Sequence, residues 1–332
     1  MANKKTIEKQ AFDLEKFNAA PEDELFQFVD ISTINSERIT APRYSYWKSV
    51  FRIFFKKPSN WIMLGILAFI IIMAIVMPFI FPYDLSENVS HPNYYNLSPS
   101  QAIDKFGFSL KWILGTGNVG QSIFAGIWAG ARTSLAIAFI CATINMLLGI
   151  LIGAVWGYNK TLDLILTFFY NIIANVPYIL LITVLVYIIG AGFWSFIFAL
   201  TVTGWVGIAF FFRTQVMIIR DREYNLASRC LGTPMTRVVT RNVLPFMTSV
   251  IVTILATELP SYISMEVFLS YIGVGLSASV PSIGRMISDA QTSWMTFPWA
   301  FWAPVAIAAA ITIILYVIGQ NLADASDPRT HM

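Results

Sequence analysis

The chain has 332 residues, of which 56% are hydrophobic and only 12% are charged, whereas an ordinary soluble domain carries roughly 25% charged residues. This composition excludes a water-soluble globular protein and predicts an all-α polytopic protein of the lipid bilayer. The net charge of +3 is too small to indicate nucleic-acid binding, and two cysteines and two histidines are too few to predict a disulfide framework or a metal site.

The N-terminal region is polar, and it lacks the short basic and apolar pattern of a cleavable signal peptide. We expect residues 1–40 to be loosely ordered. Between residues 46 and 57, aromatic side chains fall on one helical face and basic ones on another: Trp47, Phe51, Phe54 and Phe55 against Lys48, Arg52 and Lys56. This pattern predicts a helix in the membrane interface, either as an elbow that contacts a partner subunit or as a lipid anchor.

Long stretches with few charges predict the membrane-spanning helices, because one span needs about 20 mostly apolar residues. They cover residues 61–81, 133–157, 164–212, 246–265 and 301–318. The third stretch is long enough for two spans, with a break at Gly190–Gly192. The chain therefore predicts six transmembrane helices, with both termini on one side of the membrane.

The distribution of positive charge indicates which side that is. Of the 22 lysines and arginines, 18 fall on the side of the two termini, and the other four are Lys105, Lys111, Arg132 and Arg285. Since cytoplasmic loops carry the excess of Lys and Arg, we expect both termini to be cytoplasmic.

These assignments divide the chain into four regions. Residues 1–58 are expected to form a cytoplasmic segment with the interfacial helix, and 59–131 the first transmembrane helix and a long extracellular loop. Residues 132–322 are expected to form the core transmembrane domain, with a cytoplasmic loop at 213–245, and 323–332 a cytoplasmic tail. A second long outer segment, residues 266–299, follows the fifth span, and loops of such length are usually functional.

The cytoplasmic loop at 213–245 predicts two short helices joined by a sharp turn. A first helix is expected from Asp221 to Leu231, and Gly232 suits a left-handed C-terminal cap. Thr233 is then a candidate N-cap with Pro234 at the first helical position, so a second helix is expected toward Val243.

Four motifs resemble those of one transporter family. Ala227-Ser228, Gly232 and Leu244-Pro245 resemble the EAA loop of binding-protein-dependent ABC importer permeases, although Leu226 stands where the family usually has Glu and Asn242 where Ile is common. The segments 114–135, 266–284 and 321–329 resemble further motifs of the oligopeptide and dipeptide permease C subunits. The chain is thus similar to the Opp/Ami type of oligopeptide permease C subunit, which implies the ABC importer permease fold.

The resemblance also implies an assembly. It consists of a homologous B-type permease as heterodimer partner, two cytoplasmic ATPases and an extracellular lipid-anchored peptide-binding protein. The residues that would couple to the ATPases are Glu223, Ala227, Ser228, Gly232, Thr233, Pro234, Leu244 and Pro245. The sequence has no G-x-x-x-x-G-K-[ST] phosphate loop, so we expect a non-catalytic subunit without a cofactor of its own, whose partners bind ATP.

Polar residues inside the predicted spans are candidates for the translocation pathway. Glu258 is an acidic residue in the middle of the fifth span, and with Tyr262 and Glu266 it forms a row at intervals of four. Asn171 and Asn175 form a similar polar pair before Pro177. A helix-packing contact explains the Glu258 row as well as a pathway role does, and interhelical hydrogen bonding is the favoured interpretation of Asn171 and Asn175.

Three other interpretations remain open at this stage. A secondary transporter would use Glu258 as a proton site. It would leave unexplained why the loop at 213–245 resembles the EAA loop of ABC importer permeases. Dipeptide and nickel ABC importers share much of the same motif pattern. A membrane-embedded enzyme is disfavoured, since no span carries a Ser/His pair, a paired-carboxylate motif or an HExxH site.

Overall fold

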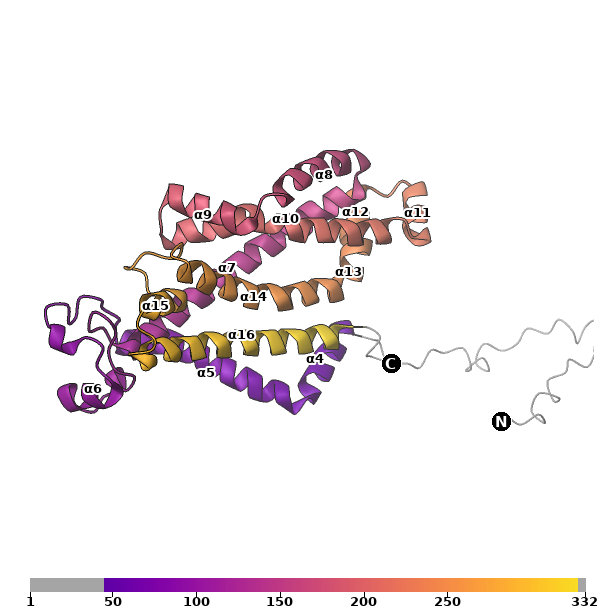
Figure 1. Ribbon diagram of the computed structural model, residues 1–332. Coiled ribbons are helices and arrows are strands. Elements are labelled where there is room, and N and C mark those ends of the chain that lie inside the picture. The colour runs from indigo at the N-terminus through magenta and orange to yellow at the C-terminus, as the bar shows by residue number, and fades with distance from the viewer. Residues whose placement is uncertain (1–44, 328–332) are drawn as a thin grey trace, which may run out of the picture. The chain divides into compact units, whose positions relative to one another are not determined.

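The computed structural model describes residues 45–327, and within them it contains helices and no strands (Figure 1). The expectations for residues 1–40 and for the last residues of the tail lie outside this range. In this range, five helices are long and apolar enough to cross a membrane: α5 (Pro58–Ile80), α7 (Ile123–Tyr158), α10 (Phe193–Arg220), α14 (Thr248–Tyr271) and α16 (Pro298–Ser326). The all-helical prediction is confirmed for the described part of the chain.

Two shorter helices, α8 (Lys160–Ala174) and α9 (Tyr178–Ile189), together form a sixth candidate span that is bent by 80°. The bend falls at Pro177, which lacks an amide hydrogen and keeps the preceding residue out of the helical region. The predicted break at Gly190–Gly192 is confirmed, with Gly190 at φ 104° between α9 and α10. The sequence therefore located the division between the two helices but missed the bend inside the first.

The long helices extend beyond the uncharged stretches. Helix α7 begins at Ile123 rather than at Thr133, because the Ser122 hydroxyl caps it by accepting from the Ala125 amide at 3.1 Å. Likewise α10 continues past Arg213 to Arg220. A single arginine at a membrane boundary leaves the backbone hydrogen bonds intact, so it does not end a helix. The domain boundary expected at residue 132 consequently falls inside α7, and the tail expected from residue 323 begins in the last turn of α16.

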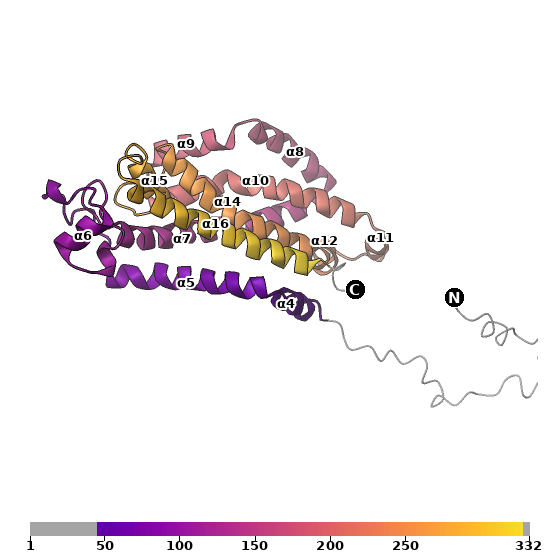
Figure 2. The same cartoon turned by 60° about the horizontal axis from the view of Figure 1, so that its bottom comes forward.

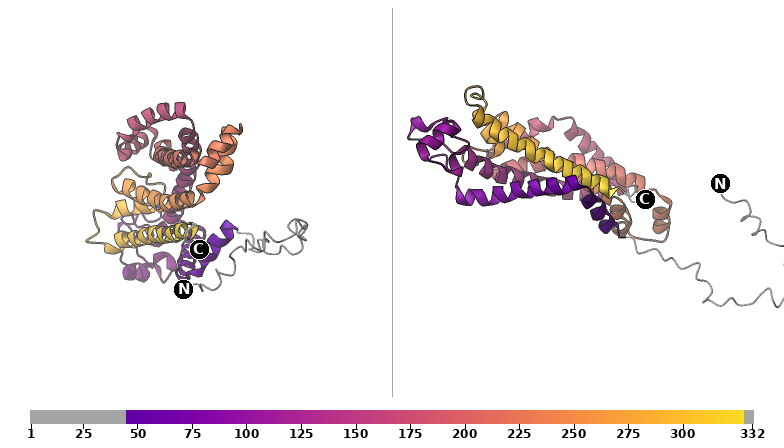
Figure 3. Two further views of the ribbon diagram at one scale, coloured as in Figure 1. Left: turned by 90° about the vertical axis from the view of Figure 1, so that its right-hand side faces the viewer. Right: turned by 90° about the horizontal axis from the view of Figure 1, so that it is seen from below.

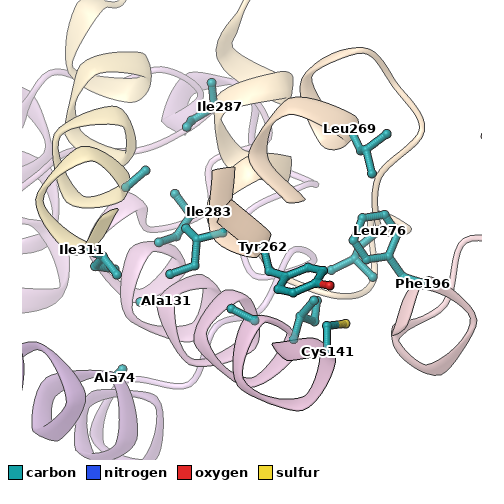
Figure 4. Close-up of a cluster of buried hydrophobic side chains, with 14 of the residues drawn as sticks. Ala74, Ala131, Cys141, Phe196, Tyr262, Leu269, Leu276, Ile283, Ile287 and Ile311 are labelled. Carbon is teal, nitrogen blue, oxygen red and sulfur yellow. The ribbon is translucent and has the colours of Figure 1, made fainter. Parts of the chain in front are cut away.

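The main hydrophobic core joins α5, α7, α10, α14, α15 (Ile283–Ala290) and α16. Figure 4 shows part of it, with Ala131, Tyr262, Ile283 and Ile311 converging from four of these helices. Close approach of α7 and α10 depends on glycines spaced four apart. A Cβ atom on Gly153 would lie 2.5 Å from the Ala209 carbonyl oxygen, so only small residues fit this contact.

The bundle has two distinct ends (Figures 1 and 2). At one end lie η4 (Pro92–Tyr94), α6 (Pro99–Phe106), η5 (Leu110–Trp112) and α15. At the other lie α4 (Tyr46–Lys56), α11 (Glu223–Cys230), α12 (Met235–Val238) and α13 (Leu244–Phe246). Helices α8 and α5 lie at opposite edges of the row of long helices (Figure 3). Helix α8 has no buried residue and α9 has only Ile182 and Val186 buried, so both leave much of their apolar surface uncovered.

The predicted interfacial helix is present as α4, although its aromatic residues divide between two faces. Phe54 is buried with Val50 against Ala325 of α16. Trp47, Phe51 and Phe55 remain exposed. The helix is therefore held by the C-terminal end of α16, while its remaining aromatic row faces outward, as an interfacial helix requires.

Candidate functional site

The helical hairpin between α10 and α14 has the turn that the sequence predicts. Gly232 has φ +78°. Its amide donates to the Arg229 carbonyl at 2.9 Å, and the Thr233 amide donates to the Ser228 carbonyl at 3.1 Å. These two bonds define a Schellman motif. A Cβ atom at Gly232 would meet nothing within 4 Å, so the glycine is required by the backbone conformation and not by a close neighbour.

The second arm of the hairpin differs from the prediction. Pro234 occupies the N-cap position of α12, one residue outside the expected place, and the Thr233 side chain makes no cap. After one turn, α12 passes into a π-helical segment, η6 (Val239–Val243), and then into α13. The expected second helix is therefore present, but residues 239–243 have π-helical and not α-helical geometry. Such π-helical turns are rare and occur frequently at functional sites.

Two asparagines clamp the arms of the hairpin together. Asn225 of α11 is fully buried, and its side-chain amide donates to the Ile219 carbonyl at 2.8 Å. Asn242 of η6 donates to the Asn225 side-chain oxygen at 3.0 Å. The unusual Asn242, noted in the sequence as a departure from the family pattern, thus has a structural partner. Sequence reasoning missed Asn225, which carries no motif of its own.

One face of the hairpin is anchored in the bundle. Val238, Val239 and Val243 lie in a buried cluster with Phe212, Val216 and Ile219 of α10 and Met146 of α7. The Arg220 guanidinium donates to the Gly157 carbonyl of α7 at 2.8 Å. It also donates to the Asp221 carboxylate, which holds the pKa of Asp221 below its usual value. Movement of the hairpin would therefore be transmitted to α7 and α10.

The opposite face of the hairpin is uncovered, and it mixes apolar and basic side chains. Leu231, at the turn, is 86% exposed, and Tyr224, Leu226 and Phe246 are also exposed. Most of the predicted coupling residues lie on this surface as well: Glu223, Ala227, Gly232, Pro234 and Pro245 are exposed, while Ser228, Thr233 and Leu244 are partly buried. An exposed apolar residue at the end of the hairpin, surrounded by arginines, is typical of a surface that binds another protein.

The predicted polar row on α14 runs from the surface into the subunit. Glu258 is half-buried, whereas Tyr262 is buried and Glu266 fully buried. The Asn145 side-chain amide of α7 donates to the Tyr262 hydroxyl at 2.5 Å. Only Glu258 of this row therefore reaches the surface of the described subunit.

Glu266 joins two of the motif segments that the sequence presented separately, 114–135 and 266–284. Its carboxylate accepts from the Ser134 hydroxyl at 2.8 Å and from the Ser270 hydroxyl at 3.0 Å, and the Ser134 oxygen in turn accepts from the Ile283 amide at 3.2 Å. A Cβ atom on Gly284 would lie 2.8 Å from the carboxylate. Helices α7, α14 and α15 thus meet at this carboxylate, and glycine is needed where they meet.

A hydroxyl-bearing stripe on α14, which the sequence analysis missed, lies beside this row. Thr257, Ser261 and Ser264 each donate to a carbonyl in the preceding turn of the same helix. They line a groove of about 590 Å³ between α14 and α16. Asn171 and Asn175 lie elsewhere, exposed at the bend between α8 and α9, where the Asn175 side-chain amide donates to the Asn171 carbonyl at 2.5 Å.

The family of the chain follows from comparison with known proteins. The family described as binding-protein-dependent transport system inner membrane component matches residues 146–332, which contain the hairpin and α14. The chain belongs to this family. The N-terminal transmembrane domain of oligopeptide transport permease C also matches, over residues 45–99, so the N-terminal part of the permease carries a related signature.

Several curated relatives match nearly the whole permease. It is 46% identical to the oligopeptide transport system permease protein AmiD of Streptococcus pneumoniae, over 93% of this chain and 98% of the relative. It is 32% identical to the dipeptide transport system permease protein DppC of Bacillus subtilis, over 95% of each chain. The OppC protein of the same organism is also 32% identical, over 89% of this chain and 93% of the relative. The predicted similarity to Opp/Ami permeases is confirmed.

Proposed function

We propose that this chain is the C-type permease subunit of an ATP-driven oligopeptide importer. It forms half of the translocation pathway, with six spans of which α8 and α9 together are the third, and with both termini in the cytoplasm. The names of the relatives support peptides as the transported substrate. The homologous second permease, two ATPases and a lipid-anchored binding protein complete the assembly.

The anchored hairpin is the observation that carries this proposal. Its buried valines contact α10, while Leu231 and Tyr224 lie uncovered on the other side. A docked ATPase that pulls on the uncovered face therefore displaces the ends of α7 and α10. The chain itself supplies no chemistry in this proposal, because the partner ATPases hydrolyse the ATP.

The polar surface of α14 is the proposed wall of the peptide pathway. Glu258 presents a carboxylate, and Thr257 and Ser261 present hydroxyls whose donors are already satisfied within the helix. Such a wall is polar enough to be hydrated beside a peptide, and it has few groups that would bind one peptide tightly. These properties suit the transport of peptides of many sequences. The amides of Asn171 and Asn175 are a second proposed contact, at the bend of the broken span.

Gly232 provides the test of the coupling role. Valine at φ +78° is strained by about 1–3 kcal/mol, whereas asparagine tolerates this conformation. In the reconstituted assembly, Gly232→Val should abolish peptide uptake and binding-protein-stimulated ATP hydrolysis. Gly232→Ala should be milder, and Gly232→Asn should retain both activities. Normal stimulated hydrolysis in Gly232→Val would contradict the coupling role and favour a transporter that needs no ATPase.

A further inference from the structure

Arg132 of α7 lies in an apolar groove on the surface of the helix bundle. The groove has a volume of about 350 Å³, and residues of α5, α7, α14 and α16 line it. Arg132 is its one charged lining residue; the others are apolar and include Ile71, Ile75, Leu135, Phe139 and Ile263. The groove thus combines a long apolar wall with a single cation.

The charge of Arg132 is uncompensated within residues 45–327. No carboxylate in this range forms an ion pair with it, and no hydrogen bond of its side chain is formed there. Several other cations do have acidic partners: Lys57, Lys111, Arg213, Arg220 and Arg285. An arginine on a membrane helix that has no partner within the protein is favourable where it reaches an anion of the interface.

The position of Arg132 along α7 fits the outer boundary of the bilayer, given the topology proposed above. Arg132 lies about 39 Å along the axis from the inner end of α7 at Tyr158, at 1.5 Å per residue. Even a tilt of about 40° leaves about 30 Å along the membrane normal, which is the thickness of the hydrocarbon core. The guanidinium therefore lies where the phosphates of the outer leaflet begin, and the apolar wall lies at the depth of the acyl chains.

The chemistry of the groove fits a phospholipid, since its apolar wall suits an acyl chain and its single cation suits a phosphate. At the depth of Arg132 every phospholipid already supplies a phosphate, whereas a partner helix would have to supply a carboxylate there. Guanidinium groups bind phosphate through paired, charge-assisted hydrogen bonds.

We propose that this groove binds one anionic phospholipid of the outer leaflet, with the phosphate on Arg132 and an acyl chain along the apolar wall. The lipid then covers the seam where α5 meets α7 and α16, next to α14. It supplies the missing counter-charge and occupies a surface that would otherwise meet bulk lipid.

Native mass spectrometry of the full chain tests this. The chain is released in mild detergent from bilayers of equal phosphatidylglycerol and phosphatidylcholine. The wild type should retain one phosphatidylglycerol in preference to phosphatidylcholine. Arg132→Gln should lower the retained fraction at least about tenfold, as expected for loss of a charge-assisted hydrogen bond, and Arg132→Lys should retain most of it. Ala136→Phe, which fills the groove and keeps the arginine, should also release the lipid.

Lys105→Gln is the matched control, since it removes a cation of the same end of the bundle outside the groove. Its retention should equal that of the wild type. Equal retention in Arg132→Gln and the wild type, or equal retention of the two lipids, would overturn the proposal. In the same measurement on the chain purified with its partner subunits, loss of a subunit from Arg132→Gln with lipid retention unchanged would also overturn the proposal, because Arg132 would then face a protein carboxylate. Because the assay requires no transport, its failure would leave the proposed importer function untouched.

Discussion

At the scale of single residues, the Glu266 carboxylate holds together segments that are far apart in the chain. Ser134 is on α7 and Ser270 on α14, and Ile283 begins α15. Glu266 has no exposed surface, and the two serines beside it are buried as well, so water cannot replace the carboxylate as the acceptor for their hydroxyls. This residue therefore fixes how the end of the bundle with α15 is packed.

Replacement of Glu266 by leucine should destabilise the permease without creating a large cavity. The Ser134 and Ser270 hydroxyls would lose their acceptor, at a cost of about 1–3 kcal/mol for each buried group left unpaired. The thermal unfolding midpoint of the purified chain in detergent should fall clearly. Glu258→Gln is the control, because Glu258 is half-buried: its midpoint should stay near that of the wild type, while peptide uptake falls. An unchanged midpoint in Glu266→Leu would show that the carboxylate is not a structural tie.

The residues that could be predicted are those whose role is decided within a few positions of the chain. Gly232 was predicted because a helix that ends before a glycine needs only local hydrogen bonds to form its cap. The bond between Glu266 and Ser134 could not be predicted, since the two residues are 132 positions apart. Spacing places Glu266 on a helical face, but which face is buried depends on the packing of other helices.

At the scale of elements, the hairpin depends on one polar contact between its arms. If Asn242 is replaced by leucine, the buried Asn225 oxygen loses its donor, at a cost of about 1–3 kcal/mol. We expect faster amide hydrogen exchange in α11 and lower stimulated ATP hydrolysis, with unchanged exchange in the middle of α10.

Thr240→Ala is a suitable comparison for this prediction. Thr240 is exposed, and its hydroxyl bonds only to the Thr236 carbonyl one turn earlier. Exchange in α11 should therefore match that of the wild type. If Asn242→Leu also exchanges like the wild type, the arms are held by the valines alone and the asparagine pair is dispensable.

Span limits were harder to predict than the number of helices. An uncharged stretch shows where lipid can surround the chain. A helix, however, continues as long as its backbone amides and carbonyls form hydrogen bonds. Ser122 and not Arg132 marks the start of α7, and the bend at Pro177 divides a stretch that carries no charge at all. Composition therefore predicts which segments lie in the membrane, while capping residues and prolines determine where each helix begins, bends and ends.

At the scale of the whole molecule, the two ends of the bundle serve different partners in the proposed importer. The end with α6 and α15 would face the binding protein, and the end with α4 and α11 would face the ATPases. The long helices between them contact one another through small residues such as Gly153 on α7 and Gly319 on α16. Such closely packed helices shift as rigid elements, which allows movement of the hairpin to change the pathway at the far end.

Thiol labelling of intact cells tests the orientation on which this division depends. Because 18 of 22 basic residues fall on the side of the termini, the positive-inside rule predicts that the hairpin is cytoplasmic. The chain has two free cysteines, of which Cys141 is buried and Cys230 exposed on the hairpin. In a Cys230→Ser background, Asp104→Cys on α6 should react with a membrane-impermeant maleimide in intact cells, and Arg237→Cys on α12 should react only after the cells are opened. Both positions are exposed, so a difference between them reports sidedness and not burial. Reaction of Arg237→Cys in intact cells, with Asp104→Cys protected, would invert the topology and would separate the hairpin from any cytoplasmic ATPase.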